Sequence, residues 1–405
     1  MKNLNDYREI VGDEKIEEIW RRAQLSQGRR IVHINSTSEG GGVAEILKSL
    51  VPLMNETGIE ADWLVLDGNE DFFTLTKEFH NALQGGPISL DKTREQLYLC
   101  TNKEFSAKCR IDADCVIIHD PQPLPLIEFY DKSQPWVWRC HVDLSYPDAA
   151  LWDFLKTYIV KYDVAIMSNN GYKKKDLPLE QRIIYPAIDP LSPKNMQLSD
   201  DEVHRYVAEA GIPMDKPVIT QVSRMDLWKD PEGLLDVFEH VRQRVDCRMV
   251  YCYSSSIDDP EGAEILARTQ RKAEKYVEDG DVLFIEGTDQ VLVNAIQRFS
   301  TVIMQKSVRE GFCLCVTEAL WKGRPVVATN VGGIPVQLRE AENGFLVEPD
   351  DTIGFADKVV QLLEDPDLAD QMGQKGKEIV RQNFLITRFM LDCLDLYDDL
   401  LGRPN

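Results

Sequence analysis

The fold of this chain is decided in one stretch, Ser307-Val308-Arg309-Glu310-Gly311-Phe312-Cys313-Leu314-Cys315-Val316-Thr317-Glu318-Ala319-Leu320. A β-rich run, Thr301 to Met304, precedes this stretch, and an apolar run with helical spacing follows its glycine. That order predicts a strand, a loop and a helix. The loop carries Glu310 and the helix carries Glu318, so one short segment holds two carboxylates.

The start of this helix is a candidate phosphate site. Backbone N–H groups at Cys313, Leu314 and Cys315 are its expected unpaired donors, and such a terminus attracts phosphate. The two carboxylates accept hydrogen bonds from hydroxyl groups. Phosphate donors and hydroxyl acceptors together suit a nucleotide sugar, whereas two unconnected surface glutamates would be the plainer interpretation.

A pair of carboxylates also suggests a glycosidase, in which the two groups lie about 5–9.5 Å apart. The eight residues from Glu310 to Glu318 would span roughly 12 Å along a helix. A loop could bring Glu310 closer, so this spacing disfavours glycosidase chemistry without excluding it.

The two glutamates, with seven residues between them, resemble the core of the family-four retaining glycosyltransferases, together with Gly311-Phe312 and the tail Ala319-Leu320-Trp321-Lys322-Gly323-Arg324-Pro325-Val326-Val327. That resemblance implies the GT-B fold. It also implies that Glu310 contacts the donor sugar and that Glu318 holds the ribose hydroxyls. The expected donor-binding residues around them are Gly311, Phe312, Cys313, Leu314 and Cys315.

Composition limits the class of protein. The chain has 405 residues, too many for one ordinary core, so two domains are expected. Its formal net charge of −22 argues against a nucleic-acid partner or an anionic membrane surface. The triple lysine Lys173-Lys174-Lys175 is expected to be a solvated face.

The nine cysteines show no C-x-x-C spacing, and the charged segment from Met1 to Arg30 lacks an apolar signal region. We therefore expect a cytoplasmic protein with reduced thiols. The six scattered histidines form no metal-binding motif. No metal or other cofactor is expected, and the partners should be small-molecule substrates.

The N-terminal part contains a second glycine loop. Arg30 to Asn35 is predicted to be a strand and Val43 to Glu56 a helix, with Gly40, Gly41 and Gly42 between them. Glycines at this place let backbone approach phosphate or sugar, so all three are candidate donor contacts, with a tight turn as the alternative. The amphipathic helix before them, Asp13 to Leu25, is expected to pack on the protein but could form a subunit contact, which leaves a homodimer open.

Alternating strands and helices predict a doubly wound parallel sheet. The further strands expected in the first half are Asp62 to Leu66, Cys115 to His119, Pro135 to Cys140, Asp163 to Met167 and Arg182 to Tyr185. Ligands bind beyond the carboxyl ends of such strands. Those ends carry Asn35, His119-Asp120, His141-Val142-Asp143 and Ser168-Asn169-Asn170.

The segments at two of these strand ends resemble one branch of the glycosyltransferase family in particular. His119-Asp120-Pro121-Gln122-Pro123 and Trp138-Arg139-Cys140-His141-Val142-Asp143-Leu144-Ser145 look like the trehalose synthase branch, which couples a nucleotide-linked glucose to free glucose. Asp120, Gln122 and Asp143 are therefore candidate acceptor-binding residues, with Asp120 and Gln122 stiffened by the prolines. The resemblance places His141 near the donor sugar, with a packed core histidine as the alternative.

The second half repeats the alternating pattern after a polar, proline-rich linker, Pro186 to Gln197. Its expected strands are Val218 to Val222, Arg248 to Tyr253, Val282 to Ile285, Thr301 to Met304, Val326 to Ala328 and Gly344 to Val347, and its final helices are Thr352 to Leu363, Asp367 to Asn383 and Ile386 to Leu401. We predict two Rossmann-like domains facing a cleft: an acceptor domain, 1–190, joined by the last helix, 386–405, and a donor domain, 191–385.

A third constellation is Ser223-Arg224-Met225-Asp226-Leu227-Trp228-Lys229-Asp230, which follows a strand and precedes a helix that Pro231 can open. Arg224 and Lys229 could clamp a diphosphate, with Ser223 among the donor contacts. The alternative is that these cations pair with Asp226 or Asp230. The loop Thr329-Asn330-Val331-Gly332-Gly333-Ile334-Pro335 also follows a strand, and its glycines permit close backbone approach, with a turn as the alternative.

The residues predict a protein that binds a nucleotide sugar, and the resemblance implies retaining glucosyl transfer from a nucleoside-diphosphate glucose to free glucose, giving trehalose. By the resemblance, Glu310, Arg224, Lys229 and His141 carry the reaction. The alternatives are another acceptor, as in sucrose- or glucan-forming enzymes, a nucleotide-sugar epimerase, or a non-catalytic nucleotide-sugar binding protein.

Overall fold

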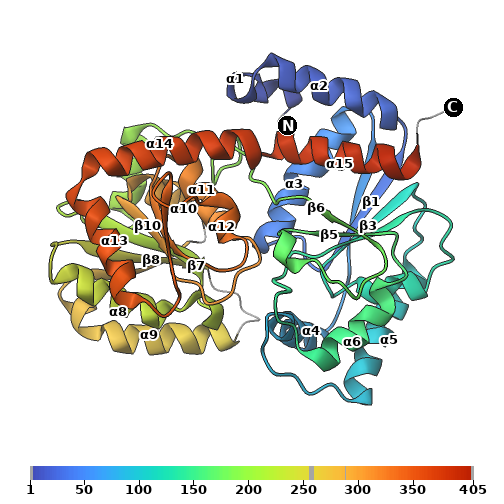
Figure 1. The fold of residues 1–405 in the computed structure, drawn as a ribbon, viewed down its shortest axis with the longest axis horizontal. Helices are drawn as coiled ribbons and strands as arrows, with labels where there is room; N and C mark the ends of the chain where they lie inside the picture. The colour runs from blue at the N-terminus through green and yellow to red at the C-terminus, as the bar shows by residue number, and fades with distance from the viewer. Residues whose placement is uncertain (1–2, 255–259, 288, 403–405) are drawn as a thin grey trace. The chain divides into compact units, whose positions relative to one another are not determined.

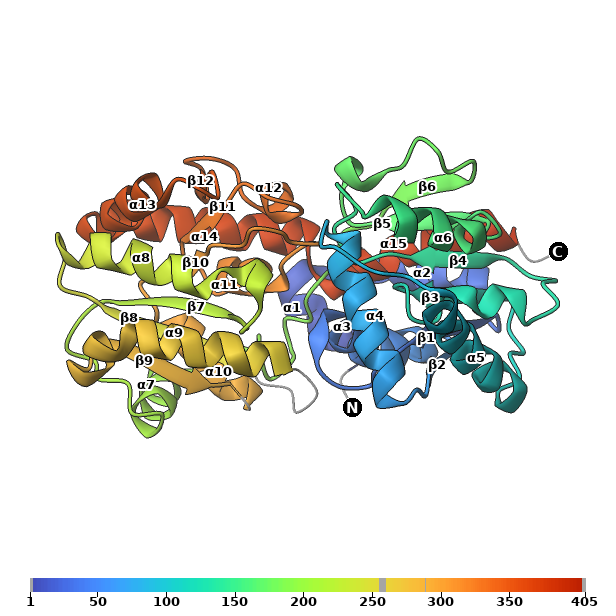
Figure 2. The ribbon, with the colours of Figure 1, turned by 90° about the horizontal axis from the view of Figure 1, so that it is seen from below.

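The computed structural model describes residues 3–254, 260–287 and 289–402. The chain divides into two compact units, Met1–Ala187 with Phe384–Asn405, and Ile188–Asn383. The boundaries predicted at residues 190 and 385 lie a few residues further along the chain. Figure 1 and Figure 2 show each unit as a sheet covered by helices.

The first unit contains a six-stranded sheet in the order β2-β1-β3-β4-β5-β6, and every paired strand runs parallel to its neighbour. The strands are β1 (Arg30–Asn35), β2 (Glu60–Val65), β3 (Cys115–His119), β4 (Trp136–Arg139), β5 (Val164–Met167) and β6 (Glu180–Ile183). Its helices are α1 (Arg8–Val11), α2 (Asp13–Ala23), α3 (Gly41–Glu56), α4 (Glu70–Leu83), α5 (Lys92–Lys108), α6 (Ala149–Ile159) and α15 (Ile386–Leu401).

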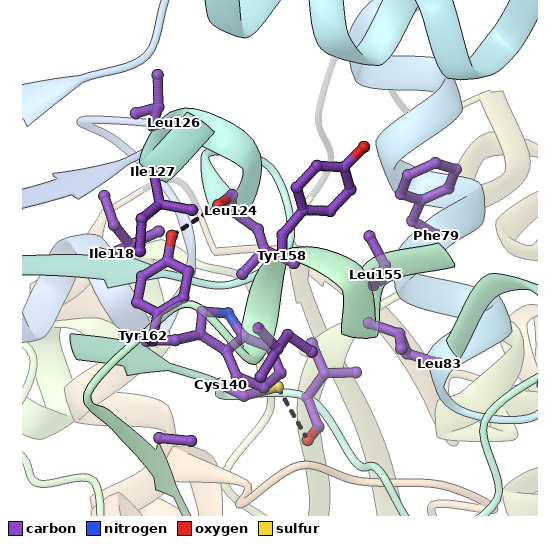
Figure 3. Close-up of a cluster of buried hydrophobic side chains, with 14 of the residues drawn as sticks. Phe79, Leu83, Ile118, Leu124, Leu126, Ile127, Cys140, Leu155, Tyr158 and Tyr162 are labelled. Atoms are coloured by element: carbon purple, nitrogen blue, oxygen red, sulfur yellow. Dashed lines mark hydrogen bonds between the residues drawn. The ribbon is translucent and has the colours of Figure 1, made fainter. Parts of the chain in front are cut away.

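Successive side chains along each strand point to opposite faces of the first sheet, and both of these faces are buried. Val32 and Ile34 of β1 belong to a core cluster with residues of α4, α5 and α6. Within this cluster the hydroxyl of Tyr162 donates a hydrogen bond to the carbonyl of Leu124 (Figure 3). The polar atom of the Tyr162 side chain is therefore paired despite its burial. The residues of opposite parity, such as His33, lie on the other face, which α15 covers through Tyr397. In Figure 1, α15 runs beside α2 and α3.

The second unit repeats this architecture with the strand order β12-β11-β10-β7-β8-β9, again parallel throughout. Its strands are β7 (Val218–Arg224), β8 (Arg248–Ser254), β9 (Val282–Glu286), β10 (Val302–Gln305), β11 (Val326–Thr329) and β12 (Gly344–Val347). Its helices are α7 (Asp200–Glu209), α8 (Pro231–Arg242), α9 (Pro260–Glu278), α10 (Gln290–Phe299), α11 (Leu314–Trp321), α12 (Ile334–Gln337), α13 (Thr352–Glu364) and α14 (Pro366–Asn383).

The second sheet is also buried on both faces. Ile219 and Met249 pack in a cluster with α8, α9 and α13. Their chain neighbours Val218 and Val250 pack in a separate cluster with α7 and α10. Both sheets are therefore doubly wound and Rossmann-like, as the sequence predicted.

All twelve predicted strands form, with small differences at their ends. The largest correction is β6, which runs from Glu180 to Ile183 and not from Arg182 to Tyr185, because Glu180 pairs with Val164 at the start of β5. The predicted linker, 186–197, needs a second correction, since most of it packs on the second unit. Asn294 donates to the carbonyls of Pro193 and Met196, and Arg298 donates to those of Asn195 and Met196.

Candidate active site

The loop that follows β10 carries Glu310, and α11 begins at Leu314, which confirms the predicted strand, loop and helix. Cys313 precedes the helix with a φ of 72°, a left-handed conformation that few side chains adopt. Cys313 is thus the residue before the helix, and the first helical N–H groups belong to Leu314 and Cys315. Strained backbone of this kind is found where the surrounding structure fixes it, often at functional sites.

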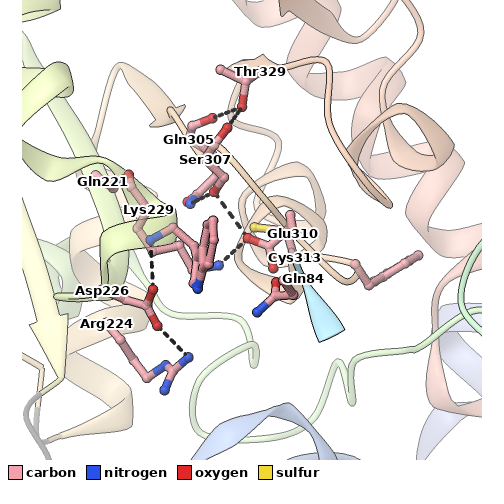
Figure 4. A network of polar contacts seen from close by, with 12 residues as sticks. Gln84, Gln221, Arg224, Asp226, Lys229, Gln305, Ser307, Glu310, Cys313 and Thr329 are labelled. Carbon is pink, nitrogen blue, oxygen red and sulfur yellow. Dashed lines mark hydrogen bonds and ion pairs between the residues drawn. The ribbon is translucent and has the colours of Figure 1, made fainter. Parts of the chain in front are cut away.

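Glu310 and Lys229 meet in the centre of the site. Lys229 forms an ion pair with Oε2 of Glu310, and Ser307 donates to the same oxygen over 3.2 Å (Figure 4). Burial by itself lowers the pKa of Lys229, but the adjacent Glu310 carboxylate outweighs that effect and raises the pKa above its ordinary value. Lys229 therefore stays positively charged at neutral pH.

Arg224 ends β7 beside the same loop and pairs with Asp226, whose Oδ2 lies 2.9 Å from its Nη2. The pairing considered from sequence is thus present. Asp226 is buried and its other oxygen accepts the N–H of Trp228 over 2.9 Å, so its position is fixed. The Arg224 side chain is 45% exposed, and its guanidinium has further N–H groups that a ligand can contact.

Asp230 does not pair with Arg224 or Lys229. Its Oδ1 accepts the N–H of Gly233 over 3.0 Å and caps α8, while its Oδ2 pairs with the buried Lys306. Asp230 has a φ of 47°, a second left-handed residue at this edge of the sheet. Lys306 was not predicted from the sequence, because its pairing with Asp230 depends on how two separate loops pack.

Glu318 lies inside the second unit and has no exposed surface. Its Oε1 is 3.1 Å from Nζ of Lys194, and its Oε2 accepts a hydrogen bond from Gln297 over 3.3 Å. Burying a carboxylate is costly unless it is paired. Lys194, from the segment before α7, and Gln297, from α10, were not singled out in the sequence.

The glycine loop after β11 braces the loop of Glu310. A Cβ on Gly333 would lie 2.7 Å from the carbonyl oxygen of Gly311, so only glycine fits there. Gln337 donates to the carbonyls of Phe312 and Cys313, and Thr317 donates to Oε1 of Gln337 over 2.6 Å. The close backbone approach predicted for this loop is therefore made to the protein itself.

In the first unit, the predicted glycine loop leads directly into α3, which begins at Gly41, two residues earlier than expected. Gly40 and Gly41 have φ of 69° and 76°, and a Cβ on either would meet nothing within 4 Å. These two glycines are required by their backbone conformation and not by a close neighbour. Ligand contact by Gly40, Gly41 or Gly42 stays a prediction.

Asp120 and His141 are brought together at the ends of β3 and β4. Asp120 has a φ of 62°, and its Oδ1 accepts the backbone N–H of His141 over 2.7 Å. Burial raises the pKa of Asp120 to about 7, against the lowering effects of that hydrogen bond and of Arg139. One carboxylate oxygen of Asp120 thus holds the backbone at His141.

The other two candidate acceptor residues differ in their surroundings. Asp143 is 2% exposed, and its Oδ1 accepts the N–H of Ser145 over 2.7 Å, which forms a turn. Oε1 of Gln122 is buried and has no hydrogen-bond partner among the described residues. Because buried polar atoms are nearly always paired, the Gln122 oxygen is the more suitable acceptor for a ligand hydroxyl.

Among the described residues, no group of three or more His, Cys, Asp or Glu side chains could hold a metal ion. In the same part of the chain, no helix has the length and apolar character needed to span a membrane.

Solved structures share this architecture. The α,α-trehalose-phosphate synthase (UDP-forming) from Burkholderia xenovorans in complex with glucose-6-phosphate superposes with a TM-score of 0.75 at 13% identity, over 93% of this chain and 100% of that one. Residues 203–379 match the family described as glycosyl transferases group 1. Fold and family together define a glycosyltransferase of GT-B architecture.

Residues 33–174 match the family described as trehalose synthase, N-terminal domain. The chain is 44% identical over 399 residues to the trehalose synthase of Thermococcus litoralis, covering 98% of this chain and 96% of that protein. It is 42% identical over 413 residues to the trehalose synthase of Rubrobacter xylanophilus, covering 99% and 98%. The chain belongs to the trehalose synthase family of glycosyltransferases.

Proposed function

We propose that this protein transfers glucose from a nucleoside-diphosphate glucose to free glucose, with retention of configuration, and so makes trehalose. The observation that carries the proposal is the cluster at the ends of β7 and β10, where Arg224, Lys229 and Glu310 lie in one polar network. Two cations beside a carboxylate suit a ligand that combines phosphates with hydroxyl groups. The name of the relatives supports trehalose as the product, and the words "UDP-forming" in the name of the structural neighbour support a nucleotide donor.

Each residue has a role in this proposal. Arg224 and Lys229 hold the diphosphate, and the start of α11 adds N–H donors to it. Lys229 has three N–H donors, so it can bind a phosphate oxygen while it keeps Glu310. Glu310 binds the donor sugar and Glu318 the ribose, with Ser223 and residues 311–315 around them.

Retention follows if the glucose hydroxyl attacks the face from which the diphosphate leaves. The leaving phosphate oxygen takes the proton of that hydroxyl. Arg224, Lys229 and the helix start stabilise the negative charge that develops on the diphosphate. This scheme assigns His141 to the donor sugar, and Asp120, Gln122 and Asp143 to glucose.

The experiment incubates the protein with several nucleoside-diphosphate α-glucoses, each with and without free glucose. The products are identified by NMR. We expect trehalose with two α linkages and one nucleoside diphosphate for each molecule formed. An isomerised donor in the absence of glucose would favour an epimerase, another disaccharide would change the acceptor, and tight donor binding without turnover would favour a binding protein.

A further inference from the structure

Four side chains of the first unit form a continuous chain of polar contacts. Nε2 of His33 lies 3.5 Å from the hydroxyl of Tyr397, and Nδ1 of His33 lies 3.0 Å from Nε2 of His119. Nδ1 of His119 lies 3.1 Å from Nε2 of His141. The rings of His119 and His141 are also stacked, with centroids 5.4 Å apart.

Strand register produces this alignment. His33 of β1 stands opposite Ile117 of β3, so His119, two residues on, lies on the same face of the sheet. His141 follows β4, the next strand, and Tyr397 comes from α15, which covers this face. The chain of contacts thus joins a helix at one end to a candidate active-site residue at the other.

The three imidazoles are neutral at physiological pH. Burial, followed by the charge of Arg139, lowers the pKa of His33 to about 3. Burial also lowers the pKa of His119 and of His141 well below the ordinary value, and Arg139 acts on both in the same direction. A neutral imidazole has one N–H donor and one acceptor nitrogen.

Since each ring donates once and accepts once, the hydrogen bonds of the chain must all point in the same direction. The Tyr397 hydroxyl also contacts the thiol of Cys393. The contact of Tyr397 with His33 sets the direction, because a phenol is a stronger donor than a neutral imidazole or a thiol, and an imidazole nitrogen is a stronger acceptor than a phenol oxygen or a thiol sulfur. With Tyr397 donating to His33, His33 donates to His119 and His119 donates to His141. His141 then carries its own proton on Nδ1, an atom with no hydrogen-bond partner among the described residues.

We propose that Tyr397, His33 and His119 are positioning residues that hold His141 in the tautomer with a proton on Nδ1. In this form His141 offers one hydrogen-bond donor to an oxygen of the sugar donor. The identity of that ligand rests on the proposed function, whereas the tautomer is a property of the protein alone. The tautomer of a histidine is set by the hydrogen bond that its other nitrogen makes, and aligned hydrogen bonds reinforce one another.

The test is ¹⁵N NMR of the protein labelled at its histidine ring nitrogens, without substrate. We expect a protonated Nδ1 and an unprotonated Nε2 for His141, assigned by the signals lost in His141→Gln. Tyr397→Phe removes the first donor, so His141 should show both tautomers or averaged shifts. The matched control is Tyr130→Phe, which removes a tyrosine hydrogen bond to the carbonyl of Cys109 in the same unit and should leave His141 unchanged.

Kinetics adds a second readout. Tyr397→Phe should lower kcat roughly two- to tenfold, the effect of one hydrogen bond, with little change in the KM for glucose. If Tyr397→Phe does not fold, His33→Gln serves as the second variant, because it interrupts the same series of hydrogen bonds at the next residue. A wild-type His141 protonated on Nε2, or an unchanged His141 in the folded variants, would overturn the positioning proposal. A fixed Nδ1 tautomer in a protein that transfers no glucose would instead count against the proposed function.

Discussion

Lys194 and Glu318 form an ion pair in which the carboxylate has no exposed surface and the Nζ to Oε1 distance is 3.1 Å. Lys194 belongs to a segment that α10 fixes in place through Asn294 and Arg298. The glutamate predicted to bind ribose is therefore held by a cation from a distant part of the chain. The position of Lys194 suggests that it sets the orientation of Glu318.

Lys194→Met should lower the free energy of unfolding by about 3 kcal/mol, because it leaves a buried carboxylate without its cation. Urea denaturation measures the change. Lys216→Met is the matched control, since its buried partner Asp281 keeps a second cation, Arg242. Adding Glu318→Gln to Lys194→Met should restore part of the lost stability. Equal losses for Lys194→Met and Lys216→Met would show that Glu318 does not depend on Lys194.

Arg224→Ala should reduce kcat/KM for the donor by a factor that corresponds to about 1.5–3 kcal/mol, the value of a hydrogen bond to a charged group. Arg244→Ala is the control, because Arg244 also pairs with an aspartate, Asp357, but at an exposed position away from the site. A folded Arg224→Ala protein with the wild-type kcat/KM would rule out the diphosphate clamp.

Glu318→Gln and Glu310→Gln should affect different ligands. Glu318→Gln should weaken binding of the free nucleoside diphosphate, since ribose loses its carboxylate. Glu310→Gln should leave that binding nearly unchanged but impair sugar transfer. Calorimetric titration with the nucleoside diphosphate, beside initial-rate kinetics, separates the two effects. Equal losses of nucleotide affinity in both variants would contradict this division.

Gln122→Ala should raise the KM for glucose more than the KM for the donor. The buried Oε1 of Gln122 has no partner among the described residues, and a site built around substrate hydroxyls loses specificity when one of its polar groups is removed. Initial rates with each substrate varied in turn give both constants. Gln134→Ala is the control, since Gln134 precedes the opposite end of β4. An unchanged KM for glucose would remove Gln122 from the acceptor site.

The pKa of Asp120 predicts a pH-dependent stability. Burial raises that pKa from 3.8 to about 7, so between these values the folded state binds more protons than the unfolded state. The contribution of Asp120 to the free energy of unfolding therefore falls as pH rises from about 4 to about 7, and it is constant above that range. Asp120→Asn keeps an oxygen acceptor for the N–H of His141 but does not titrate.

Urea denaturation of wild type and Asp120→Asn at several pH values tests this expectation. The variant should gain stability relative to wild type as pH rises from about 4 to about 7, and the difference should level off above that range. A constant difference across the range would mean that Asp120 has an ordinary pKa in the folded protein.

Hydrophobic patterns along the chain were enough to predict the twelve strands, the two doubly wound sheets and the loops that carry Glu310, Arg224 and Asp120. These features depend on residues close together in the chain, where hydrophobic periodicity and glycine or proline placement are decisive. The last helix shows this well, since its predicted bounds, Ile386 to Leu401, are those of α15. The ligand roles of these residues stay predictions.

The partners of these residues could not be predicted from the sequence and became known from the folded structure. Lys194 reaches Glu318 across more than one hundred residues of sequence, and Tyr397 reaches His33 across 364. The register between β1 and β3 places His33 beside His119. The packing of two separate loops allows Lys306 to form an ion pair with Asp230. A local sequence pattern carries no record of such contacts, because they exist only once distant segments share one core.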